Sequence, residues 1–223
     1  GVRVWYSNDV LLEGNHVLET RDAVVWYSHH LTFRDNVFAG GRYGVHLMYA
    51  DDVLIEGNLF EANSVGIYTM YSQRATLRDN IIRGHRGSSG YALGFKDVDD
   101  VEVAGNLLID NSAGVYIDGM PFTPGSLSIF HDNLIAYNDV GVIIKPAVRG
   151  NTFRANTFWE NVQQLEIDGG GGRSDANTWM GNTWSDYSGY DADADGVGDS
   201  AYAPARLFES LVDQEPRLHA LRY

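Results

Sequence analysis

The chain repeats one short pattern of alternating apolar and polar residues along most of its length. The copies are VLLEGNHV at Val10, LTFRDNVF at Leu31, VLIEGNLF at Val53, ATLRDNII at Ala75, VEVAGNLL at Val101, SIFHDNLI at Ser128, NTFRANTF at Asn151 and NTWMGNTW at Asn177. Each copy contains one recurrent Asn, and these are Asn15, Asn36, Asn58, Asn80, Asn106, Asn133, Asn156 and Asn182, spaced 21 to 27 residues apart. Alternation with a period of two inside a repeat of this length predicts β-strands in a solenoid.

The leucine-rich repeat, a solenoid of similar period, does not fit, because leucines at fixed offsets and a helical segment after the Asn are absent. A second strand pattern follows instead, as GVHLMY at Gly44, GIYTMY at Gly66, GVYIDG at Gly114 and GVIIKP at Gly141. We therefore predict an all-β fold, a right-handed parallel β-helix of about eight rungs over residues 1–184, with rungs about 4.8 Å apart. The chain starts inside a strand pattern, without an initiator Met or a signal peptide, so we expect N-terminal rungs to be missing.

The recurrent Asn has a structural explanation. At a turn, Asn tolerates left-handed backbone and can hydrogen-bond to backbone or to the equivalent Asn one rung away. Aligning the second strands then sorts their residues into columns, because side chains of a strand alternate between its two faces. In this alignment Tyr91 takes the position of Ile67 and points inward, and Gly94 follows Met70 in an outward column.

One pair of outward columns has an unusual composition. It contains Trp5, Trp26, Met48 and Met70, flanked by His46 and Tyr68, and we call these six residues the Trp/Met strip. A solvated face rarely carries such a run of large apolar side chains. The outward column of the neighbouring strand is different, because opposite charges alternate along it from Glu13 to Arg34, Glu56 and Arg78.

Composition restricts the classes of protein that fit this coil. With 223 residues and 44% hydrophobic content, the chain can bury one continuous core. It has no Cys, which excludes disulfides and thiolate metal sites. The formal net charge of -14 argues against nucleic-acid binding and disfavours polyanionic substrates. No apolar stretch of about eighteen residues is present, so no membrane span is predicted.

Without Cys, Met thioethers and His imidazoles are the ligands expected for copper, especially Cu(I) in an oxidising compartment. His46 and Met48 are two residues apart on one strand, and Met70 lies one rung away, so their side chains could converge on one ion. A hydrophobic interface, or a strip covered by a loop or by preceding rungs, explains the same pattern. His29, His30 and His85 lie in predicted turns, where a surface His is ordinary, and are reserve candidates.

The acidic run DADADGVGD begins at Asp191 and resembles a calcium-binding loop. Asp191, Asp193, Asp195 and Asp199 stand at positions one, three, five and nine, with Gly196 at the turn. Tyr202 replaces the bidentate Glu at position twelve, so an acidic turn without calcium stays open. Beyond it, RLFESLVDQ at Arg206 predicts a short helix. We assign residues 185–223 to this loop and to a segment that caps the coil or docks on a partner.

Several motifs resemble those of one family, the NosD proteins of nitrous oxide reductase maturation. They are RYGVHLMYADD at Arg42, GIYTMYSQ at Gly66, ALGFKDVDDVEVAGN at Ala92, GVYIDGMPFTP at Gly114 and NTWSDYSGYDADADGVGDSAY at Asn182. The resemblance implies a periplasmic β-helix that acts with the membrane subunit of an ABC transporter and a periplasmic copper chaperone to deliver copper to nitrous oxide reductase. It favours His46, Met48 and Met70 as copper ligands. It also implies a docking surface, which we assign to Trp5, Trp26, Tyr68, Lys96 and Asp118.

Two other functions fit the sequence. A polysaccharide lyase, hydrolase or epimerase could stack sugar rings on Trp5, Trp26, Tyr68 and Tyr116. A hydrolase would need two carboxylates about 5 to 10 Å apart, and Asp118 and Asp168 are separated by two rungs with Lys145 between them. A docking scaffold without a metal is the second possibility. We predict that the chain is not an enzyme.

Overall fold

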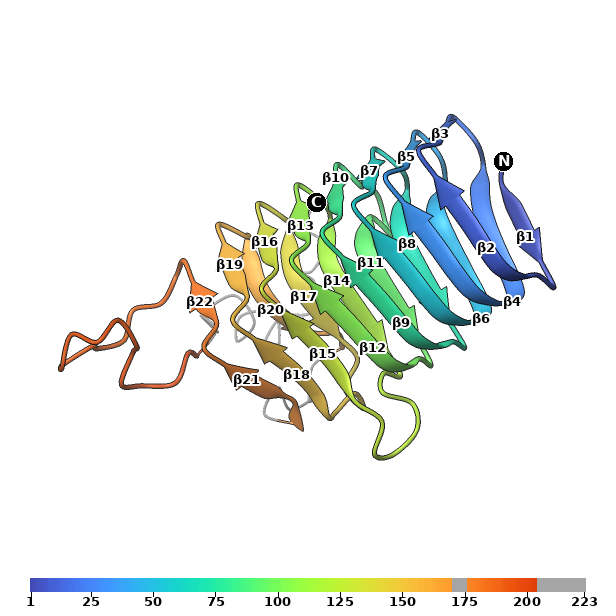
Figure 1. The fold of residues 1–223 in the computed structure, drawn as a ribbon. Helices are drawn as coiled ribbons and strands as arrows, with labels where there is room; N and C mark the ends of the chain where they lie inside the picture. Colours follow the sequence, from blue (N-terminus) through green and yellow to red (C-terminus); the bar gives the residue numbers. More distant parts are fainter. Residues whose placement is uncertain (170–175, 204–223) are drawn as a thin grey trace. The chain divides into compact units, whose positions relative to one another are not determined.

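The computed structural model describes residues 1–169 and 176–203 of the chain. The chain forms two compact units, residues 1–186 and 187–223. The first unit is a parallel β-helix of about eight turns, and each turn contributes three strands (Figure 1). The predicted all-β, right-handed parallel β-helix is confirmed. Among the described residues, no helix has the length and apolarity needed to cross a membrane.

The three strands of successive turns stack into three parallel rows. The first strands are β1 (Arg3–Trp5), the beginnings of β4 (Asp22–Arg34) and β6 (Tyr43–Glu56), β8 (Val65–Met70), β11 (Tyr91–Lys96), β14 (Ala113–Asp118), β17 (Val140–Ile144) and β20 (Gln163–Ile167). The second strands are β2 (Asn8–Glu13), the ends of β4 and β6, β9 (Gln73–Arg78), β12 (Asp99–Ala104), β15 (Ser128–His131), β18 (Asn151–Arg154) and β21 (Thr178–Met180). The third strands are β3 (His16–Leu18), β5 (Val37–Ala39), β7 (Leu59–Glu61), β10 (Ile81–Arg83), β13 (Leu107–Ile109), β16 (Leu134–Ala136), β19 (Thr157–Trp159) and β22 (Thr183–Trp184).

The first two rows belong to one sheet that bends at the corner between them, and the third row forms a second sheet. Alternation turns one side chain in two toward the inside of the coil, where one continuous apolar core is buried. Phe33, Phe60 and Phe130 are among its fully buried side chains. A core of this kind fixes the register of each strand, since a slip of one residue would expose it.

The recurrent Asn residues form a hydrogen-bonded ladder at the turn between the second and third strands. In the interior, Asn80 Nδ2 donates to Asn106 Oδ1 at 3.0 Å and to the carbonyl of Ile55 at 2.9 Å. Asn80 Oδ1 accepts from the backbone N and the Nδ2 of Asn58. The predicted bond between equivalent Asn residues is confirmed, but the left-handed residue precedes the Asn, as at Asp79 with a φ of 56°.

A second ladder follows the third strands and contains Asn63, His85, Asn111, Asn138 and Asn161. The expectation of a surface histidine in a turn is wrong for His85, which is fully buried in this ladder. Its Nδ1 lies 3.0 Å from the backbone N of Asn63, and the backbone N of His85 donates to Asn111 Oδ1 at 3.1 Å. His85 therefore replaces an Asn and is not available as a metal ligand.

The predicted register is wrong in the turn that contains β11. The structure pairs Leu93, and not Tyr91, with Ile67, so Gly94 stands opposite Tyr68 and Lys96 opposite Met70. Four extra residues precede this strand, and Gly90, which resembles the glycine that opens other first strands, lies in that longer turn. A Cβ on Gly94 would lie 2.4 Å from the Tyr68 ring, so the close approach of this ring requires glycine.

In the second unit the structure describes residues 187–203, which form turns and bends without strands. Tyr187 ties this segment together, because its hydroxyl donates to the carbonyl of Ser200 at 2.8 Å. The helix predicted at Arg206 lies outside the described residues. The role of residues 185–223 as a capping or docking segment stays a prediction.

Candidate functional site

The Trp/Met strip lies on the outer face of the first strands, where β1, β4, β6 and β8 run side by side. Parallel pairing stacks its main column, rung by rung, as Trp5, Trp26, Met48 and Met70. The adjacent column places His46 opposite Tyr68. The alternation of the first strands was thus sufficient to predict these positions.

Two of the three predicted copper ligands are already close together. The Nε2 of His46 lies 3.3 Å from the Sδ of Met70, although the two residues are 24 positions apart in the sequence. Met48 of β6 pairs with Met70 of β8, and His46 lies on β6 as well. All three side chains are partly buried. One imidazole nitrogen and two thioethers therefore lie within two rungs, and this donor set suits Cu(I).

The surroundings of His46 keep its imidazole neutral. Burial lowers the pKa of His46 below its ordinary value, and this effect outweighs the attraction of the nearby Asp22, while Arg42 lowers the pKa further. Asp22 is itself held by Arg42, whose Nη2 lies 2.7 Å from its carboxylate. The ring of Tyr43 stacks on the imidazole at 4.6 Å between centroids. A neutral, oriented imidazole is the form that coordinates a metal ion.

The two tryptophans form an apolar platform beside these ligands. Trp5 is 53% exposed and stacks on the half-buried Trp26 with 5.3 Å between ring centroids. The indole N–H of Trp26 is buried and has no hydrogen-bond partner among the described residues. Exposed stacked aromatics of this kind are common at protein contact surfaces.

Beyond Met70 the main column changes from apolar to charged. It continues with Lys96, Asp118, Lys145 and Asp168. Lys96 Nζ lies 3.1 Å from Asp118 Oδ2, and Lys145 forms the next pair with Asp168. Lys96 and Asp118, which were assigned to a docking surface, thus form an ion pair directly beside Met70.

The structure keeps the reserve histidines away from the Trp/Met strip. His29 and His30 lie past the corner at the start of the second strands, where the Nδ1 of each is 3.7 Å from Asp51 and 4.0 Å from Asp52, respectively. They belong to a different surface from His46.

The acidic loop is compact. Asp191, Asp193 and Asp195 are exposed, and one carboxylate oxygen from each lies within 4.8 Å of the others. Asp191 accepts hydrogen bonds from the backbone N of Asp195 and of Gly196 at 3.1 and 3.0 Å. Asp199 Oδ2 accepts from the backbone N of Ala192 at 2.7 Å, which closes the loop. The predicted loop positions one, three and five are therefore gathered around one point.

The sequence matches the profile of one protein family over most of its length. That family is described as NosD, periplasmic copper-binding protein, and the match covers residues 1–189. The chain belongs to the NosD family. The Trp/Met strip lies within the residues matched to this family, which is described as copper-binding.

Two NosD relatives align with part of the chain. Both are named probable ABC transporter binding protein NosD, one from Pseudomonas aeruginosa with 32% identity over 89 residues and one from Stutzerimonas stutzeri with 29% over 90. Each alignment covers 40% of this chain and 21% of the relative. The aligned part of the chain therefore spans only about a fifth of the length of these relatives.

A solved structure shares the fold. The A-module of the mannuronan C-5 epimerase AlgE6 from Azotobacter vinelandii superimposes with a TM-score of 0.54 and 15% identity, over 79% of this chain and 58% of the epimerase module. At this identity the similarity shows a shared fold alone.

Proposed function

We propose that this NosD chain handles copper as cargo in the periplasm, for assembly of the copper site of nitrous oxide reductase. The observation that carries the proposal is the 3.3 Å approach of His46 Nε2 to Met70 Sδ, beside Met48 on the same strip. The family's description as periplasmic copper-binding proteins supports it. The names of the two relatives support an ABC transporter as one partner.

In this proposal His46, Met48 and Met70 hold Cu(I). Three neutral ligands match the charge and softness of this ion. They stand on the outer face of β6 and β8 and not in a closed cage, so a ligand from a donor or an acceptor protein can replace them one at a time. A transfer site needs such exchangeable ligands, because tight enclosure would prevent release.

The docking surface consists of the rest of the strip and of Lys96 and Asp118 beside it. Trp5 and Trp26 supply apolar contact area on one side of the ligands, with Tyr68 beside them, and the Lys96–Asp118 pair supplies charge on the other side. We propose that the membrane subunit of the transporter, nitrous oxide reductase or a periplasmic copper chaperone contacts this surface during handover. The ligands lie between its apolar and charged parts, so a docked partner would cover the ion.

Titration with Cu(I) against a competing chelator tests the copper site. We expect tight binding by the wild-type chain and its loss in the triple variant His46→Ala, Met48→Ala, Met70→Ala. The matched control is His16→Ala with Met180→Ala, because these residues are exposed on other surfaces and have the same side-chain chemistry. Copper binding that survives the triple variant, or that the control also loses, would refute the assignment.

The sugar-processing alternative receives little support from the charged residues that continue the main column beyond Met70. Asp118 and Asp168 are each paired with a lysine. Burial raises the pKa of Tyr68 and of Tyr116, and the hydrogen bond to Asp118 raises the pKa of Lys96. None of these directions favours proton abstraction near neutral pH. We expect a panel of polysaccharides to yield neither reducing ends nor unsaturated products.

We also propose calcium binding by Asp191, Asp193, Asp195 and Asp199. The support is the gathering of three carboxylates together with the loop spacing. Millimolar calcium should raise the unfolding temperature and give a calorimetric signal that the double variant Asp193→Asn, Asp195→Asn loses. Asp9→Asn, an exposed substitution in β2, is the control. The absence of both effects in the wild-type chain would contradict calcium binding.

A further inference from the structure

Two charged groups beside the proposed copper ligands are already occupied. Lys96 pairs with Met70 from the next turn, and its ammonium lies 3.1 Å from Asp118. Asp22, which acts on the charge of His46, accepts two hydrogen bonds from Arg42 at 2.8 and 2.7 Å. An ammonium has no lone pair for a metal ion, and a carboxylate in a bidentate pair is already neutralised. A further contact to the ion therefore has to come from an uncharged neighbour.

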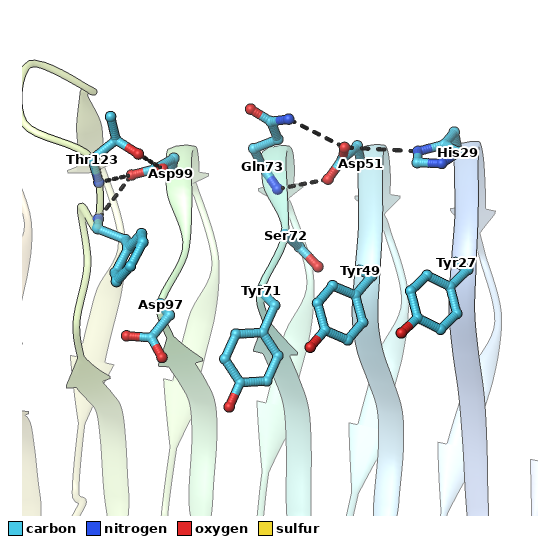
Figure 2. A pocket seen from close by; sticks show the side chains of 11 residues that line it. Tyr27, His29, Tyr49, Asp51, Tyr71, Ser72, Gln73, Asp97, Asp99 and Thr123 are labelled. Atoms are coloured by element: carbon cyan, nitrogen blue, oxygen red, sulfur yellow. Dashed lines mark hydrogen bonds and ion pairs between the residues drawn. The ribbon is translucent and has the colours of Figure 1, made fainter.

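The aromatic rings beside the strip lie across the axis of the coil. Figure 2 shows Tyr27, Tyr49 and Tyr71 in one row over three neighbouring turns. Their rings stack with 4.8 and 5.1 Å between centroids, which is about the spacing of neighbouring strands. The ring planes of Trp26 and Tyr27 differ by only 6°. The two faces of the Trp26 indole are therefore directed along the axis, one toward each neighbouring turn.

The two faces of Trp26 have different neighbours. On one side lies Trp5, whose ring centroid is 5.3 Å away. On the other side Trp26 pairs with Met48, which pairs in turn with Met70. Neighbouring strands are about 4.8 Å apart, a spacing at which a thioether and an aromatic ring attract each other. Trp26 thus presents one π face to the side of the strip that carries the methionines.

The Trp26 ring is held by stacking and not by a hydrogen bond. The side chain is half-buried, and its indole N–H is buried without a partner among the described residues. An unpaired buried donor costs free energy. A leucine or a phenylalanine would fill the same place without that cost, so the presence of an indole points to a function of the ring itself.

The face of an indole attracts cations. The quadrupole of an aromatic ring places negative charge over its face, and Trp binds cations better than Tyr or Phe. Cu(I) carries a positive charge, whereas the thioethers of Met48 and Met70 and the imidazole of His46 carry none in their neutral forms. The ring can therefore attract the ion without replacing one of these ligands. It offers no lone pair to Cu(II), which prefers nitrogen and oxygen ligands.

We propose that Trp26 is a copper-binding residue whose indole face covers Cu(I) on the side of β4. This inference rests on the proposed copper site and adds a fourth contact to it. The ring also shields the ion from dioxygen. In the reaction that it slows, Cu(I) gives one electron to dioxygen, and the products are Cu(II) and superoxide. The cargo thus stays in the oxidation state that suits its thioether ligands.

The variants Trp26→Leu and Trp26→Phe test the role of the ring in the Cu(I) titration. Leu removes the π face and keeps an apolar side chain, whereas Phe keeps a weaker π face. We expect Trp26→Leu to lose about threefold to thirtyfold in affinity, which is the strength of a cation–π contact converted to a binding constant, and Trp26→Phe to lose less. Trp5→Leu is the matched control, because this indole lies on the side of Trp26 away from Met48, and it should bind Cu(I) like wild type.

Two further measurements separate a copper contact from packing. Cu(I) added without air should quench the tryptophan fluorescence of the wild-type chain. The Trp26→Leu variant should lose most of this quenching, although four of the five tryptophans remain. After exposure to air, the electron paramagnetic resonance signal of Cu(II) should appear several-fold faster in Trp26→Leu than in wild type. Trp5→Leu should follow wild type in both measurements.

The copper site and the role of Trp26 can fail separately. If wild type does not bind Cu(I), both proposals are overturned. If wild type binds Cu(I) and a folded Trp26→Leu variant has the same affinity, quenching and oxidation rate, only the role of Trp26 is overturned, and this ring is a docking contact alone. Equal losses in Trp5→Leu and Trp26→Leu would also overturn it, because the effect would then come from packing of the two indoles.

Discussion

At the scale of single residues, the electrostatic state of His46 decides how copper binding depends on pH. Burial holds the pKa of its imidazole below the ordinary 6.5, so protons compete with copper only at lower pH than for an exposed histidine. We expect the Cu(I) affinity to stay constant as the pH falls from neutral to 6.5, and to decline below it. The His46→Ala variant should bind more weakly and lack this decline. Affinity that already falls above pH 6.5 would contradict a buried neutral ligand.

His85 should make the fold sensitive to acid. Burial, opposed by the hydrogen bond to Asn63, lowers its pKa from 6.5 to about 4. The unfolded chain therefore binds more protons between these two pH values, and the free energy of unfolding falls as the pH falls through this window, by up to about 3 kcal/mol. Urea unfolding at several pH values measures this effect.

The control for this prediction is a variant in which an Asn takes the place of His85 in the ladder. His85→Asn restores the residue that Asn63 and Asn111 supply one rung away on either side. We expect this variant to fold and to lose stability less steeply on acidification. An equally steep loss in the variant would show that the carboxylates, and not His85, cause the acid sensitivity.

At the scale of elements, the Asn ladder determines how much each turn contributes to stability. Asn80→Ala removes two donated hydrogen bonds and leaves the backbone N of Asn58 without its acceptor. Leaving buried groups unsatisfied should cost about 2 to 4 kcal/mol. Asn15→Ala lies on the exposed first rung and should cost less than about 1 kcal/mol. Denaturant unfolding compares the two, and equal losses would argue against the ladder as a main source of stability.

The strands and turns of the coil could be predicted from the sequence only in part. Alternation and the Asn period were sufficient to predict the coil, the turn Asn and the placement of the Trp/Met strip. They could not predict the register of β11, because the four-residue insertion before it contains Gly90 in the position where other turns have their first-strand glycine. The contact between Gly94 and Tyr68 depends on the neighbouring turn, which a residue-by-residue alignment does not include.

Part of the candidate site was also hidden from the sequence. The pairing of β6 with β8 places His46 and Met70 in adjacent columns, but the 3.3 Å contact between their side chains could not be derived from the spacing of 24 positions. His85 has the same surroundings in sequence as a surface turn histidine, and only the ladder shows that it is buried. A row of stacked tyrosines, in contrast, had a readable signal, since Tyr27, Tyr49 and Tyr71 each directly follow a residue of the strip.

At the scale of the whole coil, each turn contacts mainly the turns before and after it. Substitutions in distant turns should therefore add, and substitutions in adjacent turns should couple. We expect Asn36→Ala and Asn156→Ala to lower the free energy of unfolding additively, within about 0.5 kcal/mol. Asn80→Ala and Asn106→Ala share a hydrogen bond and should deviate from additivity by more than this. Coupling between the distant pair would indicate a cooperative unit larger than neighbouring turns.

The main column of the strip runs along the coil from Trp5 through the two methionines to the Lys96–Asp118 pair. Its two ends are chemically different, so the column has a direction. A partner that lies lengthwise on it can satisfy the aromatic end and the charged end in one orientation only. Reversal would place charge on the tryptophans and apolar groups on the ion pair. An ion held at the methionines would therefore always meet the partner from the same side, and the geometry of handover would follow from the order of the rungs.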